Sequence, residues 1–133
     1  MAANSHHTIT VCTDCRRLAP DDLAAAAIAG LLRERLDEGV PPASHFAIRG
    51  TACMAACDTP CAVAFQAEGK ASYLFSRISS DADVRALVDF ARLYAERPDG
   101  MSRQCERPKL LARKTLARIP SLVSNRTGAD HEL

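Results

Sequence analysis

Five of the six cysteines in this 133-residue chain lie in two short segments, and their thiol groups are the side chains best suited to chemistry. The first segment holds Cys12 and Cys15, and the second holds Cys53, Cys57 and Cys61. Four converging thiolates bind zinc or an iron–sulfur cluster, because soft sulfur ligands suit those centres. The sequence therefore predicts a metal centre held by Cys12, Cys15, Cys53 and Cys57, with Cys61 as the alternative fourth ligand.

The two cysteine spacings differ in what they indicate. Cys12 and Cys15 are separated by two residues, a spacing found in metal knuckles and in redox dithiols. Cys53, Cys57 and Cys61 are separated by three residues each, and a loop with such gaps can surround a body larger than one ion. This spacing favours a cluster without excluding zinc, and Cys61 could instead be a buried core residue.

Two other uses of the thiols are open. A small secreted protein could form a disulfide framework, but the clustered cysteines and the absence of an export signal favour a reducing compartment. A thioredoxin-type dithiol should sit at the start of a helix, where the helix dipole lowers the thiol pKa. Residues 16–20 separate Cys15 from the next expected helix, which weakens that interpretation. The sixth cysteine, Cys105, is isolated and is expected to be inert.

Alternating and helical apolar patterns predict the elements that position these cysteines. Residues 7–11 alternate polar with β-branched side chains and so predict a strand that ends at Cys12. A stripe of leucine, isoleucine and alanine at helical spacing predicts a helix, and Gly39 ends it. The remaining predictions are a strand at 44–50, a hairpin of strands at 62–67 and 71–75, and a helix that begins with a capping box of Ser80 and Asp83 and stops at 98–100.

The order strand, helix, strand, hairpin, helix predicts an α/β layer with one early crossover between parallel strands. In such sheets, functional loops gather at the carboxyl ends of the strands. If the first two strands are parallel neighbours, the two cysteine segments emerge side by side. A thioredoxin-like arrangement, with a mixed sheet of about four strands packed by two helices, is the simplest solution.

The chain resembles the thioredoxin-like [2Fe–2S] ferredoxins over residues 8–95. The likeness is carried by a first strand that closes on Cys12 and, most strongly, by residues 53–75, where Cys53 and Cys57 precede a short loop and an apolar strand. It is closer still to a bacterial family described only as predicted metal-binding proteins, which shares the early cysteine pair, the three-cysteine loop and the trailing segment 116–120.

The ferredoxin resemblance implies a [2Fe–2S] cluster with Cys12, Cys53 and Cys57 among its ligands. The second ferredoxin cysteine lies much further along the chain than Cys15 does here. The fourth ligand is therefore Cys15 or Cys61, and a [4Fe–4S] cluster stays open. The same resemblance implies redox partner proteins and a homodimer.

Charge divides the chain into two parts. Residues 1–100 carry 10 basic and 13 acidic side chains, whereas residues 101–133 carry 7 basic and 3 acidic ones. We expect 1–100 to be the metal- or Fe–S-binding domain and 101–133 to be a basic extension, with an amphipathic helix at 109–119 and a mobile end from 125. The chain lacks the broad positive face of a nucleic-acid binder and any apolar run long enough for a membrane span, so a cytoplasmic location is expected.

The sequence therefore predicts an iron–sulfur protein that transfers electrons between partner proteins. The alternatives are a zinc- or cobalt-binding module for metal delivery or structure, and a dithiol redox protein. No nucleophile–base–acid set or phosphate-binding glycine loop is present, so an electron carrier or metal-binding protein is expected rather than an enzyme. The pair His6-His7 could add a metal ligand, but it is expected to be solvated.

Overall fold

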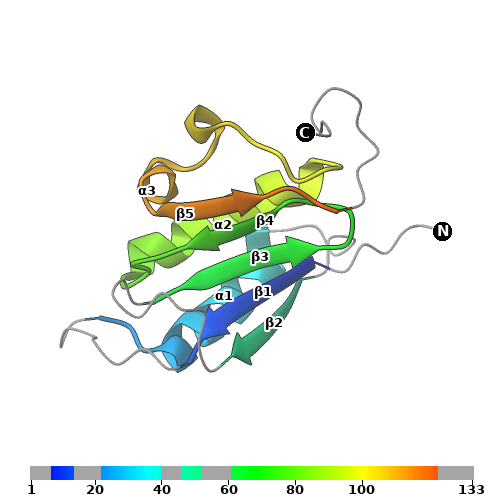
Figure 1. Ribbon diagram of the computed structural model, residues 1–133. Coiled ribbons are helices and arrows are strands. Elements are labelled where there is room, and N and C mark those ends of the chain that lie inside the picture. Colours follow the sequence, from blue (N-terminus) through cyan, green and yellow to red (C-terminus); the bar gives the residue numbers. More distant parts are fainter. Residues whose placement is uncertain (1–6, 14–21, 40–45, 52–60, 123–133) are drawn as a thin grey trace.

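A five-stranded mixed sheet, covered on one face by two long helices, forms the body of the protein (Figure 1). The computed structural model describes residues 7–13, 22–39, 46–51 and 61–122. The elements in chain order are β1 (His7–Cys12), α1 (Ala25–Gly39), β2 (Phe46–Thr51), β3 (Val63–Ala67), β4 (Ser72–Phe75), α2 (Asp81–Glu96), the short 3-10 helix η1 (Gln104–Glu106), α3 (Lys109–Ala112) and β5 (Thr115–Ile119).

Strand β1 lies inside the sheet, whose strand order is β2-β1-β3-β4-β5. It pairs in parallel with β2 and antiparallel with β3, while β3 with β4 and β4 with β5 are antiparallel pairs. The parallel pairing across α1 confirms the predicted crossover, and the hairpin of β3 and β4 is also confirmed. This topology is consistent with a thioredoxin-like α/β fold.

The core lies between the sheet and the helices, and aromatic side chains fill its centre. Phe65 of β3 packs edge-on against Phe90 of α2 at 4.9 Å between ring centroids, and Tyr73 and Phe75 of β4 contact the same ring. All four side chains are at most 1% exposed. Burying each such ring stabilises the fold by about 2–3 kcal/mol, so these contacts fix α2 against the sheet.

The two long helices begin at the same end of the sheet. Ser80 caps α2: its hydroxyl accepts a hydrogen bond from the Asp83 amide, and the Asp83 carboxylate accepts one from the Ser80 amide, which confirms the predicted capping box. The amide of Leu23, two residues before α1, donates to the carbonyl of Ser79 at 2.9 Å. The amino ends of α1 and α2 are therefore neighbours.

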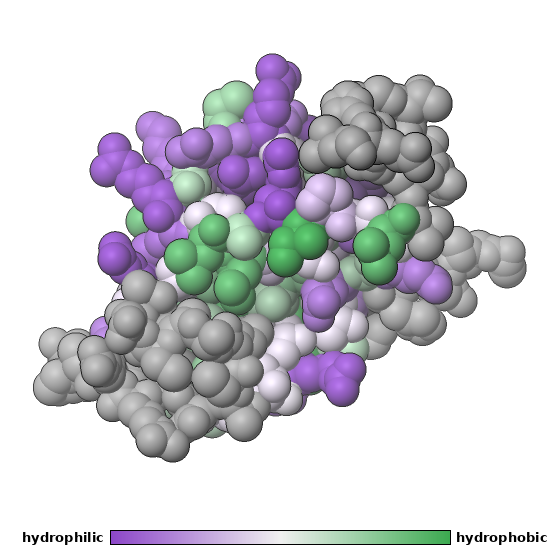
Figure 2. All heavy atoms as spheres, viewed as in Figure 1, coloured by the Kyte–Doolittle hydropathy of each residue, from purple (hydrophilic) through white to green (hydrophobic). Residues whose placement is uncertain are grey.

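The segment after α2 differs from the sequence-based expectation. The predicted helix at 109–119 is wrong beyond Ala112, because Thr115–Ile119 forms β5, which pairs with β4. The leucines of this segment have helical spacing, but pairing with Ser72–Phe75 decides its conformation. The sheet consequently has five strands rather than about four, and residues 101–122 pack on the body. Hydrophobic side chains lie on the face of the molecule opposite α1 and α2 (Figure 2). The mobile end expected from residue 125 lies outside the described residues. Across the described ranges, no helix is long and apolar enough to cross a bilayer.

Candidate metal centre at the end of the sheet

Cys12 ends β1, the strand that lies between β2 and β3. It is in register with Thr51, the last residue of β2. On its other side, its amide donates to the carbonyl of Ala62 at 3.0 Å, just before β3. The residue is 5% exposed. Cys12 is therefore flanked by the two segments that enter and leave the loop containing Cys53 and Cys57.

The carboxyl ends of β1 and β2 are tied together beyond the last paired residues. Thr13 donates to the carbonyl of Thr51 twice, from its amide at 2.7 Å and from its hydroxyl at 3.0 Å. Gly50 faces the same threonine, and a Cβ at this position would lie 2.9 Å from Thr13 Cγ2. A side chain at residue 50 would push the two strand ends apart, so glycine permits their close approach.

Cys61 is fully buried beside Cys12. Its Sγ donates a hydrogen bond to the Cys12 carbonyl at 3.2 Å. Its backbone exchanges hydrogen bonds with Ile78, at 3.3 Å from its amide and 3.1 Å to its carbonyl. A thiol that donates a hydrogen bond carries its proton, whereas a metal ligand must be a thiolate. In this conformation the Cys61 thiol contacts the backbone at the end of β1, and the Cys61 backbone pairs with Ile78 after β4.

Three of the predicted ligands, Cys15, Cys53 and Cys57, lie outside the described residues. Cys53 follows Thr51 by two positions, so the chain holds their Cα atoms within about 7 Å of each other. The structure thus brings Cys12 and Cys61 together and sets Cys12 level with Thr51, the last described residue before the second cysteine segment. Within the described part of the chain, no three histidine, cysteine or acidic side chains form a group that could hold a metal ion.

The amino ends of α1 and α2 both lie at this end of the sheet, and they differ in the charge of their first turns. A helix amino terminus carries a partial positive charge that stabilises nearby anions. The first turn of α1 has no acidic side chain. In α2 the Asp83 carboxylate instead receives hydrogen bonds from Lys114 Nζ at 2.7 Å and from the Ser79 amide at 3.0 Å. Burial raises the pKa of Asp83, but these bonds outweigh burial and hold its pKa below the usual value.

Cys105 and His7 lie elsewhere. Cys105 is exposed in η1, beyond α2. The expectation that His7 is solvated is wrong, because it is 3% exposed and its ring stacks on Phe46 at 4.7 Å. Its Nε2 lies 2.8 Å from the ammonium of Lys70, which also donates to the carbonyl of Tyr94 at 2.7 Å. Burial lowers the pKa of Lys70, and the nearby Asp99 charge raises it in part.

The sequence did not predict a buried polar network that joins β4 to the segment after α2. The hydroxyl of Tyr73 donates to the Gly100 carbonyl at 2.7 Å and lies 2.8 Å from the Ser102 hydroxyl. Arg107 and Arg118 both donate to the Ser102 carbonyl, at 2.9 Å and 2.7 Å. The only sequence signal for this network is a set of isolated polar residues in a segment interpreted as a loop.

The fold is that of an α/β protein of thioredoxin-like topology. Cys12 lies at the carboxyl end of its interior strand β1, and Cys61 lies beside it. Residues 9–121 match the profile of the family described as "Protein of unknown function (DUF1636)", and the chain belongs to this family. No curated protein and no solved structure matches the chain. The match runs through β5, so the family domain includes most of the segment predicted to be a separate extension.

Proposed function

We propose that this protein holds a [2Fe–2S] cluster at the carboxyl ends of β1 and β2 and transfers single electrons between partner proteins. The observation that carries the proposal is the parallel register of the two strands, which sets Cys12 level with Thr51, two residues before Cys53. The two cysteine segments thereby follow neighbouring strand ends, although residues 12 and 53 are 41 positions apart in the sequence. The resemblance to thioredoxin-like ferredoxins, stated above from the motifs, agrees with this position.

The ligand set we propose is Cys12, Cys15, Cys53 and Cys57. The burial of Cys61 and its hydrogen bond to the Cys12 carbonyl support a structural role for that thiol. With Cys61 engaged in this way, Cys15 is the fourth ligand. A cluster of four thiolates and two sulfides is anionic, so the amino end of α1, whose first turn has no acidic side chain, would stabilise it.

In the proposed function the cluster supplies the redox chemistry, and the chain tunes and presents it. The cluster would accept one electron from a reduced partner protein and pass it to an oxidised one. The near-complete burial of Cys12 would exclude water from one ligand, and exposure to solvent is one determinant of cluster potential. A cytoplasmic, reducing location and a homodimer belong to this proposal.

Metal and sulfide analysis of anaerobically purified protein tests the proposal. We expect two iron and two acid-labile sulfide per chain, and visible absorption that dithionite bleaches. Colourless protein that contains one zinc per chain, or coloured protein that contains one cobalt but neither iron nor sulfide, would contradict the proposal and favour a metal-holding module. Metal-free protein with a reversible Cys12–Cys15 disulfide would contradict it in favour of a dithiol redox protein.

Single cysteine substitutions test the ligand set. Cys12→Ser, Cys15→Ser, Cys53→Ser and Cys57→Ser should each abolish or shift the visible spectrum. Cys61→Ala should retain the spectrum while lowering thermal stability, because it leaves a small buried cavity. Cys105→Ser is the matched control and should change neither property. A spectrum lost in Cys61→Ala but kept in Cys15→Ser would assign Cys61 as the fourth ligand and refute the structural role.

A further inference from the structure

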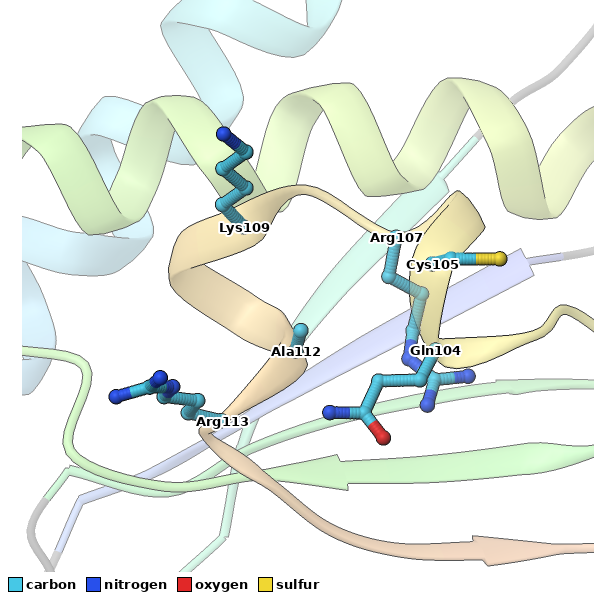
Figure 3. A pocket seen from close by; sticks show the side chains of 6 residues that line it. All are labelled: Gln104, Cys105, Arg107, Lys109, Ala112 and Arg113. Atoms are coloured by element: carbon cyan, nitrogen blue, oxygen red, sulfur yellow. The ribbon is translucent and has the colours of Figure 1, made fainter.

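A hollow of about 720 Å³ lies between η1 and α3, away from the cysteine-bearing end of β1 (Figure 3). Its volume is within the range of pockets that bind small molecules. No acidic side chain is among its lining residues, and three of the six are basic. The lining residues are Gln104, Cys105, Arg107, Lys109, Ala112 and Arg113.

The positive charge of this hollow is not neutralised by the described part of the protein. From residue 103 to residue 118 the chain has six basic side chains and one acidic one, Glu106. Glu106 is already paired with Arg97 at 2.6 Å. Over the described ranges, no ion pair engages the three basic lining residues. An anion that enters the hollow would therefore meet uncompensated positive charge.

Arg107 is held in place by Ser102 and Tyr73, which engage only part of its guanidinium group. Its Nη1 donates to the Ser102 carbonyl at 2.9 Å and to the Ser102 hydroxyl at 3.1 Å, and the guanidinium lies over the Tyr73 ring at 5.6 Å. Its Nε is buried and has no hydrogen-bond partner among the described residues. Because a buried atom cannot be reached from the hollow, the nitrogen that remains available to an oxygen of a carboxylate or phosphate is Nη2, which no hydrogen bond among the described residues engages.

The other lining side chains suit the same ligand. Figure 3 shows Gln104 and Arg107 extending into the space between η1 and α3, whereas the thiol of Cys105 points away from it. The amide of Gln104 can donate hydrogen bonds to an oxyanion. Figure 3 shows the charged ends of Lys109 and Arg113 directed away from this space, so these two side chains would add only long-range attraction.

We propose that this hollow binds a small oxyanion-bearing molecule, either a phosphate or a carboxylate compound, with Arg107 as its anchor. A ligand oxygen at Nη2 of Arg107 would accept a charge-assisted hydrogen bond, and the Gln104 amide would be a second donor beside it. Arg107 would bring little ordering cost to this binding, because Ser102 and Tyr73 already fix its conformation. The inference does not depend on the proposed cluster.

Calorimetric titration of the full chain with inorganic phosphate, and separately with citrate, tests the inference at constant ionic strength. We expect saturable binding of one of these anions. Arg107→Lys keeps the charge but loses the planar guanidinium that Ser102 and Tyr73 hold in place, and it should weaken binding about tenfold. Arg113→Ala should weaken it about threefold, through the loss of one nearby charge. Arg33→Ala is the matched control, because this exposed residue of α1 carries the same charge on another element.

The pattern across variants decides the outcome. Binding by phosphate alone or citrate alone supports the inference and identifies the ligand chemistry. Absence of saturable binding by both probes overturns it, as does equal weakening in Arg33→Ala, which would indicate attraction to net charge only. If thermal unfolding shows that Arg107→Lys is not folded, Gln104→Ala and Arg113→Ala still decide, and wild-type affinity in both overturns the inference.

Discussion

Replacing Asp83 by asparagine should destabilise the protein through the loss of one buried charge. The carboxylate is 3% exposed, with Oδ1 accepting from Lys114 and Oδ2 accepting from the amides of Ser79 and Ser80. Asparagine has nearly the same shape but only one oxygen, so it cannot serve both sets of donors. Its amide group would then face either the lysine ammonium or the two backbone amides.

The expected loss is about 2 kcal/mol. A hydrogen bond between charged groups contributes about 1.5–3 kcal/mol, and the lower end applies because Lys114 is 22% exposed and can turn to water. The weakened capping box adds about 0.5–1 kcal/mol. For a chain of this size, a loss of about 2 kcal/mol corresponds to a fall of about 6 °C in the unfolding temperature.

Thermal unfolding followed by circular dichroism measures this effect, with Asp89→Asn as the matched control on the same helix. Asp89 is 62% exposed and lies 4.0 Å from Arg92, so its substitution should change stability by less than about 0.5 kcal/mol. A double-mutant cycle of Asp83→Asn with Lys114→Met should give a coupling of about 1 kcal/mol.

The pH dependence of the stability difference between wild type and Asp83→Asn gives a second test of this reasoning. The pKa of Asp83 is lower in the folded protein than its usual 3.8, so its stabilisation is present above the unfolded value and is lost as pH falls through the folded value. The stability difference between wild type and Asp83→Asn should shrink below about pH 4. Equal unfolding temperatures at pH 7, or a difference that persists unchanged at pH 2, would refute this reasoning.

Three other outcomes are expected. Tyr73→Phe should lower the free energy of unfolding by about 1–3 kcal/mol in denaturant titration, because it leaves the buried Gly100 carbonyl without its donor. In an NMR titration, Glu106 should have a pKa of about 2, lowered mainly by its hydrogen bonds from Arg97, and Arg97→Ala should raise that pKa toward 4.5. Burial lowers the pKa of Lys70, so the folded chain loses this proton at a lower pH than the unfolded chain does. The stability of the wild type relative to Lys70→Met should therefore rise as pH increases from the folded pKa toward 10.5.

The elements with strong local signals could be predicted from the sequence. The alternating residues of β1, the turn between β3 and β4, and the Ser80–Asp83 capping box all specify their structure within a few positions. The fold is an α/β protein with elements in this order. The strand β5 was missed, because its conformation depends on pairing with β4, more than 40 residues earlier in the chain.

The candidate site could be predicted only in part, for a similar reason. The position of Cys12 at a strand end follows from the pattern of residues 7–11, and its neighbour Thr51 follows from the parallel crossover. The burial of Cys61 depends on its partners Cys12 and Ile78, which are distant in sequence, so the sequence left its role open. The metal centre and all of its ligands, Cys12 included, stay predictions.

The interior position of β1 has a consequence for the order of events during synthesis. It is made before the other described strands, yet its two flanks are completed only when residues 46–51 and then 61–67 have been translated. Until then both of its edges lack partners, and Cys12 has neither Thr51 nor Ala62 beside it. An inorganic centre anchored there would be loaded after folding, as a late step of maturation, and could not act as the nucleus around which the chain collapses.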